Sequence, residues 1–221
     1  MPGAIEPFTE VGVEPMVRGF LHTPDQANGD ALVLTHGAGG NAKMTLLVAL
    51  AEAFAGGGYT VLRCDLPFRQ SRSFGPPRPS EAARDRQGLR NAAEAVRTLV
   101  TGRVFLGGQS YGGRQATLLC ADEPGLAQGL LLTSYPLHPP GKPTALRTEH
   151  FPRLRIPILF VEGTKDPFAS VEEMGSAMKL IPAKATILKI EGVGHDLGFK
   201  KIGAAGEWPG KILASFREFF A

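Results

Sequence analysis

The stretch Leu106-Gly107-Gly108-Gln109-Ser110-Tyr111-Gly112-Gly113 joins a strand-like run, residues 103–106, to a helix-like run, residues 114–120. Its spacing is Gly-x-Ser-x-Gly. A serine with this spacing can occupy a sharp turn from strand to helix, because the flanking glycines remove Cβ atoms that would otherwise clash. The pattern therefore predicts that Ser110 holds its hydroxyl above the first turn of a helix, which is the position of a nucleophile.

The composition favours an ordinary globular protein. With 221 residues, of which 43% are hydrophobic, we expect one domain over residues 1–221 with a sizeable buried core. The net charge of +3 is spread along the chain, so we expect no nucleic-acid partner. The N-terminus is acidic and broken by proline, and no apolar run approaches roughly 18 residues. We therefore expect a soluble cytoplasmic protein without a membrane partner, and the oligomeric state stays open.

The two cysteines favour no metal or disulfide framework. Cys64 and Cys120 lie far apart and without Cys-x-x-Cys spacing. We interpret them as reduced core residues, and we expect neither a metal nor an organic cofactor.

Strand-like and helix-like segments alternate along the chain. An early strand at 16–21, whose pairing is not readable, precedes them. The expected strands are 31–35, 59–64, 103–106, 129–134, 156–163 and 186–190, and the expected helices are 43–55, 80–100, 114–120, 170–181 and 211–220. Ser80 is a candidate helix cap, and Ser170 begins a capping-box pattern. This alternation predicts the α/β class, with a mostly parallel sheet and helices on both faces.

Four chemically suggestive positions each follow an expected strand. The loop 36–40, Ser110, Asp166 and His195 should therefore meet at the carboxyl edge of the sheet. There His195 would take the proton of Ser110 as a general base, and Asp166 would orient the imidazole. Each residue has a simpler interpretation, since Ser110 could be a helix cap, His195 a loop histidine and Asp166 a turn residue.

An oxyanion needs backbone donors, and the candidates are the N–H groups of Tyr111 and Ala38. The neighbouring loop residues His36, Gly37 and Gly39 are candidates for the substrate pocket, although the glycines could simply form a tight turn.

The segment 68–79 is rich in proline, arginine and serine, and more arginines follow it. We hypothesise that Arg69 or Arg72 reaches the pocket rim and favours an anionic acyl or leaving group. The alternative is that these arginines are solvated surface residues.

The order serine, acid, histidine, together with the His-Gly loop and Gly192-Val193-Gly194-His195-Asp196, resembles the α/β-hydrolase superfamily over nearly the whole chain. More narrowly, His36-Gly37-Ala38-Gly39 and Gly108-Gln109-Ser110-Tyr111-Gly112-Gly113-Arg114 look like small, lidless dienelactone-hydrolase-like and KANL3/Tex30-type members. The resemblance implies the α/β-hydrolase fold and a hydrolase without fixing its substrate. Many relatives carry a cap domain, for which residues 135–155 are too few. We therefore expect an open, shallow pocket, with poor activity on long lipids unless the segment 68–79 folds over it.

We therefore predict a serine hydrolase that cleaves small carboxylic esters through an acyl-enzyme on Ser110. Its partner would be a small-molecule ester or thioester substrate. The alternatives are a thioesterase or peptidase with the same triad, or a non-catalytic binding module of this fold. Phe151, Phe199 and Trp208 could line the pocket or pack in the core.

Overall fold

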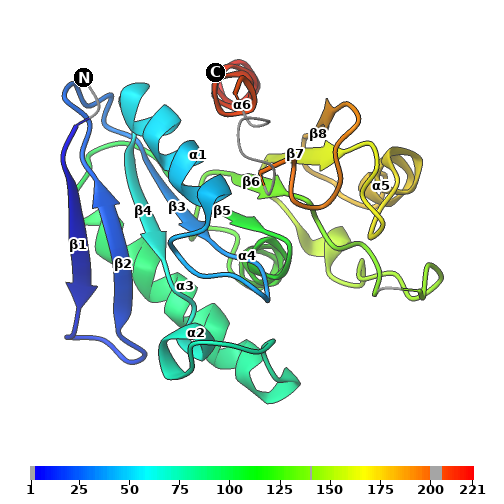
Figure 1. Cartoon of the computed structure of the whole chain (residues 1–221), viewed down its shortest axis with the longest axis horizontal. Coiled ribbons are helices and arrows are strands. Elements are labelled where there is room, and N and C mark those ends of the chain that lie inside the picture. Colours follow the sequence, from blue (N-terminus) through cyan, green and yellow to red (C-terminus); the bar gives the residue numbers. More distant parts are fainter. Residues whose placement is uncertain (1–2, 140, 200–205) are drawn as a thin grey trace.

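The computed structural model describes residues 3–139, 141–199 and 206–221, which form an eight-stranded sheet (Figure 1). The strands lie in the order β1-β2-β4-β3-β5-β6-β7-β8. The pairs β1–β2 and β2–β4 are antiparallel, and the other neighbours are parallel. The bounds are β1 Ile5–Glu10, β2 Val17–His22, β3 Ala31–Thr35, β4 Thr60–Cys64, β5 Val104–Gln109, β6 Leu130–Thr133, β7 Ile158–Gly163 and β8 Ala185–Ile190.

Helices cover both faces of this sheet (Figure 1). Helices α1 (Thr45–Gly56) and α6 (Trp208–Phe219) pack together on one face. Helices α3 (Ala82–Arg97), α4 (Tyr111–Asp122) and α5 (Val171–Met178) supply side chains to the core on the other face. The short helix α2 (Pro67–Ser71) follows β4, and single 3₁₀ turns lie at Pro79–Glu81 and Phe151–Arg153.

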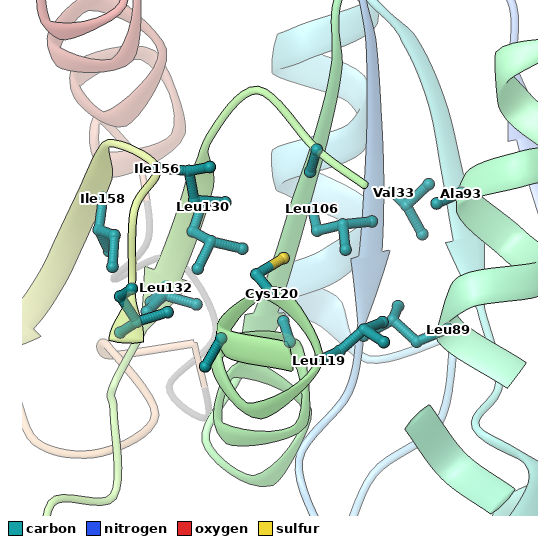
Figure 2. Packing of buried hydrophobic residues seen from close by; sticks show 14 of the residues in the cluster. Val33, Leu89, Ala93, Leu106, Leu119, Cys120, Leu130, Leu132, Ile156 and Ile158 are labelled. Atoms are coloured by element: carbon teal, nitrogen blue, oxygen red, sulfur yellow. The ribbon is translucent and has the colours of Figure 1, made fainter. Parts of the chain in front are cut away.

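Successive side chains of a strand point to opposite faces of the sheet. Because helices cover both faces, the central strands are buried on both. Val33 and Leu106 belong to the core beneath α3 and α4, whereas Leu34 and Phe105 belong to the core beneath α1 and α6. Figure 2 shows the first of these cores, where strand residues meet the side chains of α3 and α4, including Cys120. Uninterrupted apolar runs in the sequence thus correspond to two-sided burial.

The prediction of an α/β fold without a cap domain is confirmed. The segment between β6 and β7 contains the 3₁₀ turn Phe151–Arg153, and no cap domain lies among its described residues. The sequence prediction missed β1, whose edge position leaves a mostly exposed strand without a strong apolar pattern. It also missed α2 at the start of the segment 68–79.

Two cap predictions had different outcomes. Ser170 accepts a hydrogen bond from the Glu173 N–H at 3.1 Å, and the Glu173 carboxylate accepts one from the Ser170 N–H at 2.7 Å, so the capping box is confirmed. The prediction of Ser80 as a cap is wrong. A 3₁₀ turn at Pro79–Glu81 precedes α3, and there the Glu81 carboxylate accepts the N–H of Arg78.

Among the described residues, no helix is long and apolar enough to cross a membrane.

Candidate active site

Ser110 occupies a strained turn between β5 and α4. Its φ is 52°, a left-handed value that is uncommon for a residue with a side chain. The turn is tight on both sides. A Cβ on Gly108 would lie 2.5 Å from the Gly113 nitrogen, and one on Gly112 would lie 2.6 Å from the His36 carbonyl oxygen. The glycines of the Gly-x-Ser-x-Gly pattern are therefore required by close backbone contacts in the turn that carries Ser110.

A hydrogen-bonded relay connects three loops at the carboxyl edge of the sheet. His195 Nε2 lies 2.9 Å from Ser110 Oγ, and His195 Nδ1 lies 2.7 Å from Asp166 Oδ2. Because a carboxylate only accepts hydrogen bonds, Nδ1 carries the proton and Nε2 is free to accept the proton of the serine. The Asp166 side chain is fully buried, whereas that of His195 is 24% exposed. The acid is thus enclosed and the base reaches the solvent-accessible side.

Neighbouring groups hold both relay partners in place. The second oxygen of Asp166 accepts the backbone N–H of Phe168 at 2.8 Å, which fixes the carboxylate plane. The ring of Phe168 packs on the His195 imidazole with centroids 4.3 Å apart, and Gln109 Nε2 donates to the His195 carbonyl at 3.2 Å. The imidazole therefore has a restricted orientation before any substrate binds.

A second buried carboxyl lies behind this acid. Glu162 on β7 is fully buried, and its Oε1 accepts the Tyr135 N–H at 2.7 Å. Burial, and then the nearby charge of Asp166, raise the pKa of Glu162 well above its usual value. This shift favours the protonated form of Glu162.

His36 is the first residue of the loop 36–40, and its buried side chain is hydrogen-bonded to backbone groups outside the relay. The N–H of Leu66 donates to His36 Nε2 at 3.1 Å, so Nδ1 carries the hydrogen and donates to the Gly37 carbonyl at 2.8 Å. The same carbonyl accepts the Gly40 N–H at 3.0 Å. Because the peptide unit is planar and trans, fixing the Gly37 oxygen also fixes the opposing N–H of Ala38. Burial lowers the pKa of His36, which favours this neutral form.

Arg69 holds the same loop from its other side. Its guanidinium donates to the carbonyls of Gly40 at 2.7 Å and Ala38 at 3.0 Å, and also to that of Gly75 at 3.0 Å. Arg72 donates to Glu81 and to the Pro76 carbonyl at 2.6 Å, which ties together the segment 72–81. The terminal guanidinium nitrogens of both arginines are thus hydrogen-bonded within the protein.

The phenol of Tyr111 is bound to a buried acid on α3. Its hydroxyl donates to Asp85 Oδ2 at 2.7 Å, and Asp85 Oδ1 accepts the Phe68 N–H at 2.9 Å. The backbone N–H of Tyr111 begins α4, so it has no carbonyl one turn earlier in the helix. This N–H is therefore available to a ligand beside Ser110.

The relay opens into a cavity of about 1020 Å³. Residues 76–79, at the end of the segment 68–79, form part of its wall. The cavity is lined by Gly37, Ala38, Gly39, Gly40, Met44, Thr45, Leu46, Pro76, Pro77, Arg78, Pro79, Ala82, Gln109, Ser110, Tyr111, Arg114, Gln115, Pro136, Arg147, Phe168, His195, Asp196 and Phe199. Among the described residues, no group of three or more His, Cys, Asp or Glu side chains could hold a metal ion.

The structure brings together Ser110, His195 and Asp166, and it places Ala38 and Tyr111 beside the serine on the cavity wall. Gly37 and Gly39 also line the cavity, but His36, Arg69 and Arg72 do not belong to its lining and instead support the loops around it.

Three residues that the sequence left undecided divide between these environments. Phe199 lines the cavity and, like Trp208, packs against the core beneath α1 and α6, whereas Phe151 is buried in the core beneath α3 and α4.

The polar residues of the cavity that sequence reasoning missed include Arg114, Gln115 and Arg147. Arg114 could have been found, because it lies one helical turn beyond Ser110 on an expected helix. Arg147 lies in a segment with no regular secondary structure, so no periodicity indicated its direction.

Comparisons with solved structures show the same fold at low sequence identity. A lidless α/β serine hydrolase from Xanthomonas campestris superposes with a TM-score of 0.77 at 18% identity, covering 99% of this chain and 96% of that chain. A dienelactone hydrolase from Anabaena variabilis gives 0.76 at 18% identity, with 99% of each chain covered. An α/β serine hydrolase homologue from Coxiella burnetii gives 0.75 at 17% identity, covering 95% and 96%.

The narrower likeness to KANL3/Tex30-type members stays a prediction.

A family model described as an alpha/beta hydrolase domain matches residues 28–209, which include β3 to β8 and all three relay residues. The chain therefore belongs to the alpha/beta hydrolase domain family.

Proposed function

We propose that this protein is a serine hydrolase that cleaves small carboxylic esters through an acyl-enzyme on Ser110. The observation that carries the proposal is the relay itself. Ser110, His195 and Asp166 are joined by hydrogen bonds of 2.9 and 2.7 Å at the wall of a large cavity. Membership of a hydrolase family supports the same conclusion.

In the acylation step, Ser110 Oγ attacks the ester carbonyl carbon and its proton passes to His195 Nε2. Asp166 stabilises the resulting imidazolium through the proton on Nδ1. The tetrahedral intermediate then collapses. The bond to the alcohol oxygen breaks, and His195 returns the proton to that oxygen as the alcohol departs. A water molecule repeats the sequence on the acyl-enzyme and releases the carboxylic acid.

The negative charge that develops on the carbonyl oxygen needs donors that are already in position. The N–H groups of Tyr111 and Ala38 are suited to this role because neither has to be reoriented. The first begins a helix, and the second is fixed through the Gly37 carbonyl. One donor of this kind contributes roughly 3 kcal/mol to stabilising the transition state.

A non-catalytic module would not need these features. Ser110 keeps a strained backbone conformation, which costs on the order of 1–3 kcal/mol. The relay additionally has an enclosed carboxylate and an oriented imidazole. Such an arrangement supports catalysis more directly than it supports binding alone.

The test is the hydrolysis of p-nitrophenyl esters from acetate to decanoate by the wild type, Ser110→Ala and Ser176→Ala. Ser176 is an exposed serine on α5 and provides the matched control. We expect multiple turnovers on short esters, a loss on the order of 10⁶-fold in kcat for Ser110→Ala, and wild-type rates for Ser176→Ala. Retention of more than a hundredth of the activity in a folded Ser110→Ala protein would exclude Ser110 as the nucleophile.

A further inference from the structure

The cavity wall formed by the start of α4 carries hydrogen-bond donors that the protein does not use. Arg114 lies four residues after Ser110, which is about 6 Å along the helix axis. The side chain is half-buried, and its Nε is enclosed without a hydrogen-bond partner among the described residues. An enclosed guanidinium nitrogen without an acceptor is unfavourable, so its position calls for an external one.

Gln115 repeats this feature beside Arg114. It is fully buried and lines the cavity, and its Oε1 accepts a hydrogen bond from Arg86 at 3.2 Å. That bond fixes the amide so that Nε2 is left as a donor. Within the described part of the chain, Nε2 has no partner. The wall thus offers a second buried donor next to the first.

Arg147 adds a further positive charge from another segment. It is half-buried, lines the same cavity and donates to the Pro136 carbonyl at 3.2 Å, which fixes its position after β6. Burial, and then the charge of Arg114, lower the pKa of Arg147. Two guanidinium groups that disfavour each other's charge are therefore held on one cavity.

The charge of the cavity lining is consequently unbalanced. Its described residues include three arginines, Arg78, Arg114 and Arg147, and one acid, Asp196, which lies next to His195 in the chain. Arg69 and Arg72 do not compete for a ligand, since their guanidinium groups are bound to carbonyls and to Glu81. The anion-binding capacity of the site therefore does not come from Arg69 or Arg72, and beyond Arg78 it lies on the α4 wall and the segment after β6.

We propose that Arg114 and Arg147, with the amide of Gln115, form a subsite for a carboxylate carried by the ester substrate. This inference rests on the proposed function, because the subsite positions that ester against Ser110. A carboxylate suits the site because guanidinium groups donate planar pairs of hydrogen bonds to its two oxygens. One turn of helix separates Arg114 from the nucleophile, so the carboxylate lies a short spacer away from the scissile carbonyl. The substrate class is thus the half-ester of a short dicarboxylic acid, or a short ester whose alcohol carries the acid.

The experiment compares kcat/KM for monoethyl glutarate and for its carboxamide isostere, ethyl 5-amino-5-oxopentanoate. A second pair, 3-acetoxybenzoate and 3-acetoxybenzamide, carries the charge on the leaving group instead. We expect wild type to prefer the charged member of one pair by on the order of tenfold or more. In Arg114→Gln and Arg147→Gln, the ratio of kcat/KM for the charged ester to kcat/KM for the neutral ester should fall toward one, even if both values change.

Arg153→Gln is the matched control. This arginine is 59% exposed, pairs with Asp122 at 3.0 Å and does not line the cavity, so the same loss of charge should leave the preference intact. An equal fall in the control would attribute the preference to net charge and overturn the subsite. Circular dichroism identifies any variant that fails to fold, and Arg147→Gln then provides the test without disturbing α4.

Failure of the subsite and failure of the proposed function give different results. Efficient hydrolysis of the neutral esters without a preference for either charged ester would overturn the subsite and leave the hydrolase standing. If no ester is cleaved, calorimetry of Ser110→Ala protein with monoethyl glutarate still tests the subsite. Binding that is lost with the carboxamide and in Ser110→Ala/Arg114→Gln supports it, and equal binding of the two compounds contradicts it.

Discussion

The two sides of the candidate active site are built differently. On one side, the relay uses side chains that contact one another directly, from Ser110 through His195 to Asp166. On the other, the loop 36–40 presents backbone groups, and the side chains that matter stand behind it. There His36 and Arg69 bind the carbonyls of the loop and leave its front to the cavity.

This difference explains how a residue type can mislead. A histidine beside a glycine-rich loop at the edge of a parallel sheet has the composition of a catalytic group. His36, however, is fully buried, and Leu66 N–H and the Gly37 carbonyl occupy its two nitrogens. His195 has an acid on one nitrogen and a nucleophile on the other. The hydrogen-bond partners, and not the residue type, assign one histidine to support and the other to proton transfer.

We expect the largest effect on kcat from a substitution in the relay, even one that replaces a single oxygen by nitrogen. Asp166→Asn keeps the Oδ1 that accepts the Phe168 N–H but removes the carboxylate facing His195. We expect kcat on p-nitrophenyl acetate to fall on the order of 10⁴-fold with little change in stability, because the imidazole loses its tautomer and its counter-charge. Asp122→Asn, an exposed acid on α4, is the control. A loss below tenfold would remove Asp166 from the relay.

A substitution that weakens the support of the loop 36–40 should have a smaller effect, and this effect should appear in kcat. His36→Leu removes one of the two donors to the Gly37 carbonyl, so the N–H of Ala38 is held less firmly. We expect kcat to fall roughly 10- to 100-fold while KM stays within about twofold, since part of an oxyanion donor is lost. His36→Asn, whose amide can replace Nδ1–H, should recover part of the loss. The buried His150, which binds Thr117 at 2.8 Å, provides the control through His150→Leu. Equal effects at both histidines would reduce His36 to a packing residue.

We expect the smallest effect from the buried histidines, and it concerns how the free energy of unfolding depends on pH. Burial, and then Arg63, lower the pKa of His22 to about 4, and burial, and then Arg114, lower that of His150 to about 4. Unfolded chains bind these protons near pH 6.5, so the unfolding free energy should fall as pH drops from 6.5 toward 4. In urea unfolding, the free energy of unfolding of the wild type should be lower at pH 5 than at pH 7. In His150→Gln this difference between the two pH values should be about 1–2 kcal/mol smaller. An unchanged difference would show that His150 is already charged at pH 5.

Much of the fold could be predicted because buried strands have a strong local pattern. Runs such as Leu32-Val33-Leu34 are apolar without interruption, and both faces of the sheet are covered. The edge strand β1 has no such pattern, since one side of it faces solvent. Similarly, Ser110, Asp166 and His195 were found because each follows a strand in the sequence.

Other parts of the site depend on contacts between distant segments and could not be read from spacing. Arg69 reaches carbonyls about thirty residues away, and the direction of Arg147 depends on the path of an irregular segment. Arg69 and Arg147 have the same side chain, yet one completes a loop and the other faces a cavity. Only the tertiary structure separates these roles.

The most direct test of the account is the intact mass of the protein after incubation with a fluorophosphonate, for the wild type and for Ser110→Ala. An activated serine attacks phosphorus and retains the phosphonyl group, whereas an ordinary serine does not react. We predict one adduct on the wild type and none on Ser110→Ala. A folded wild-type protein that gains no adduct, or a Ser110→Ala protein that still gains one, would contradict the assignment of Ser110 as the nucleophile.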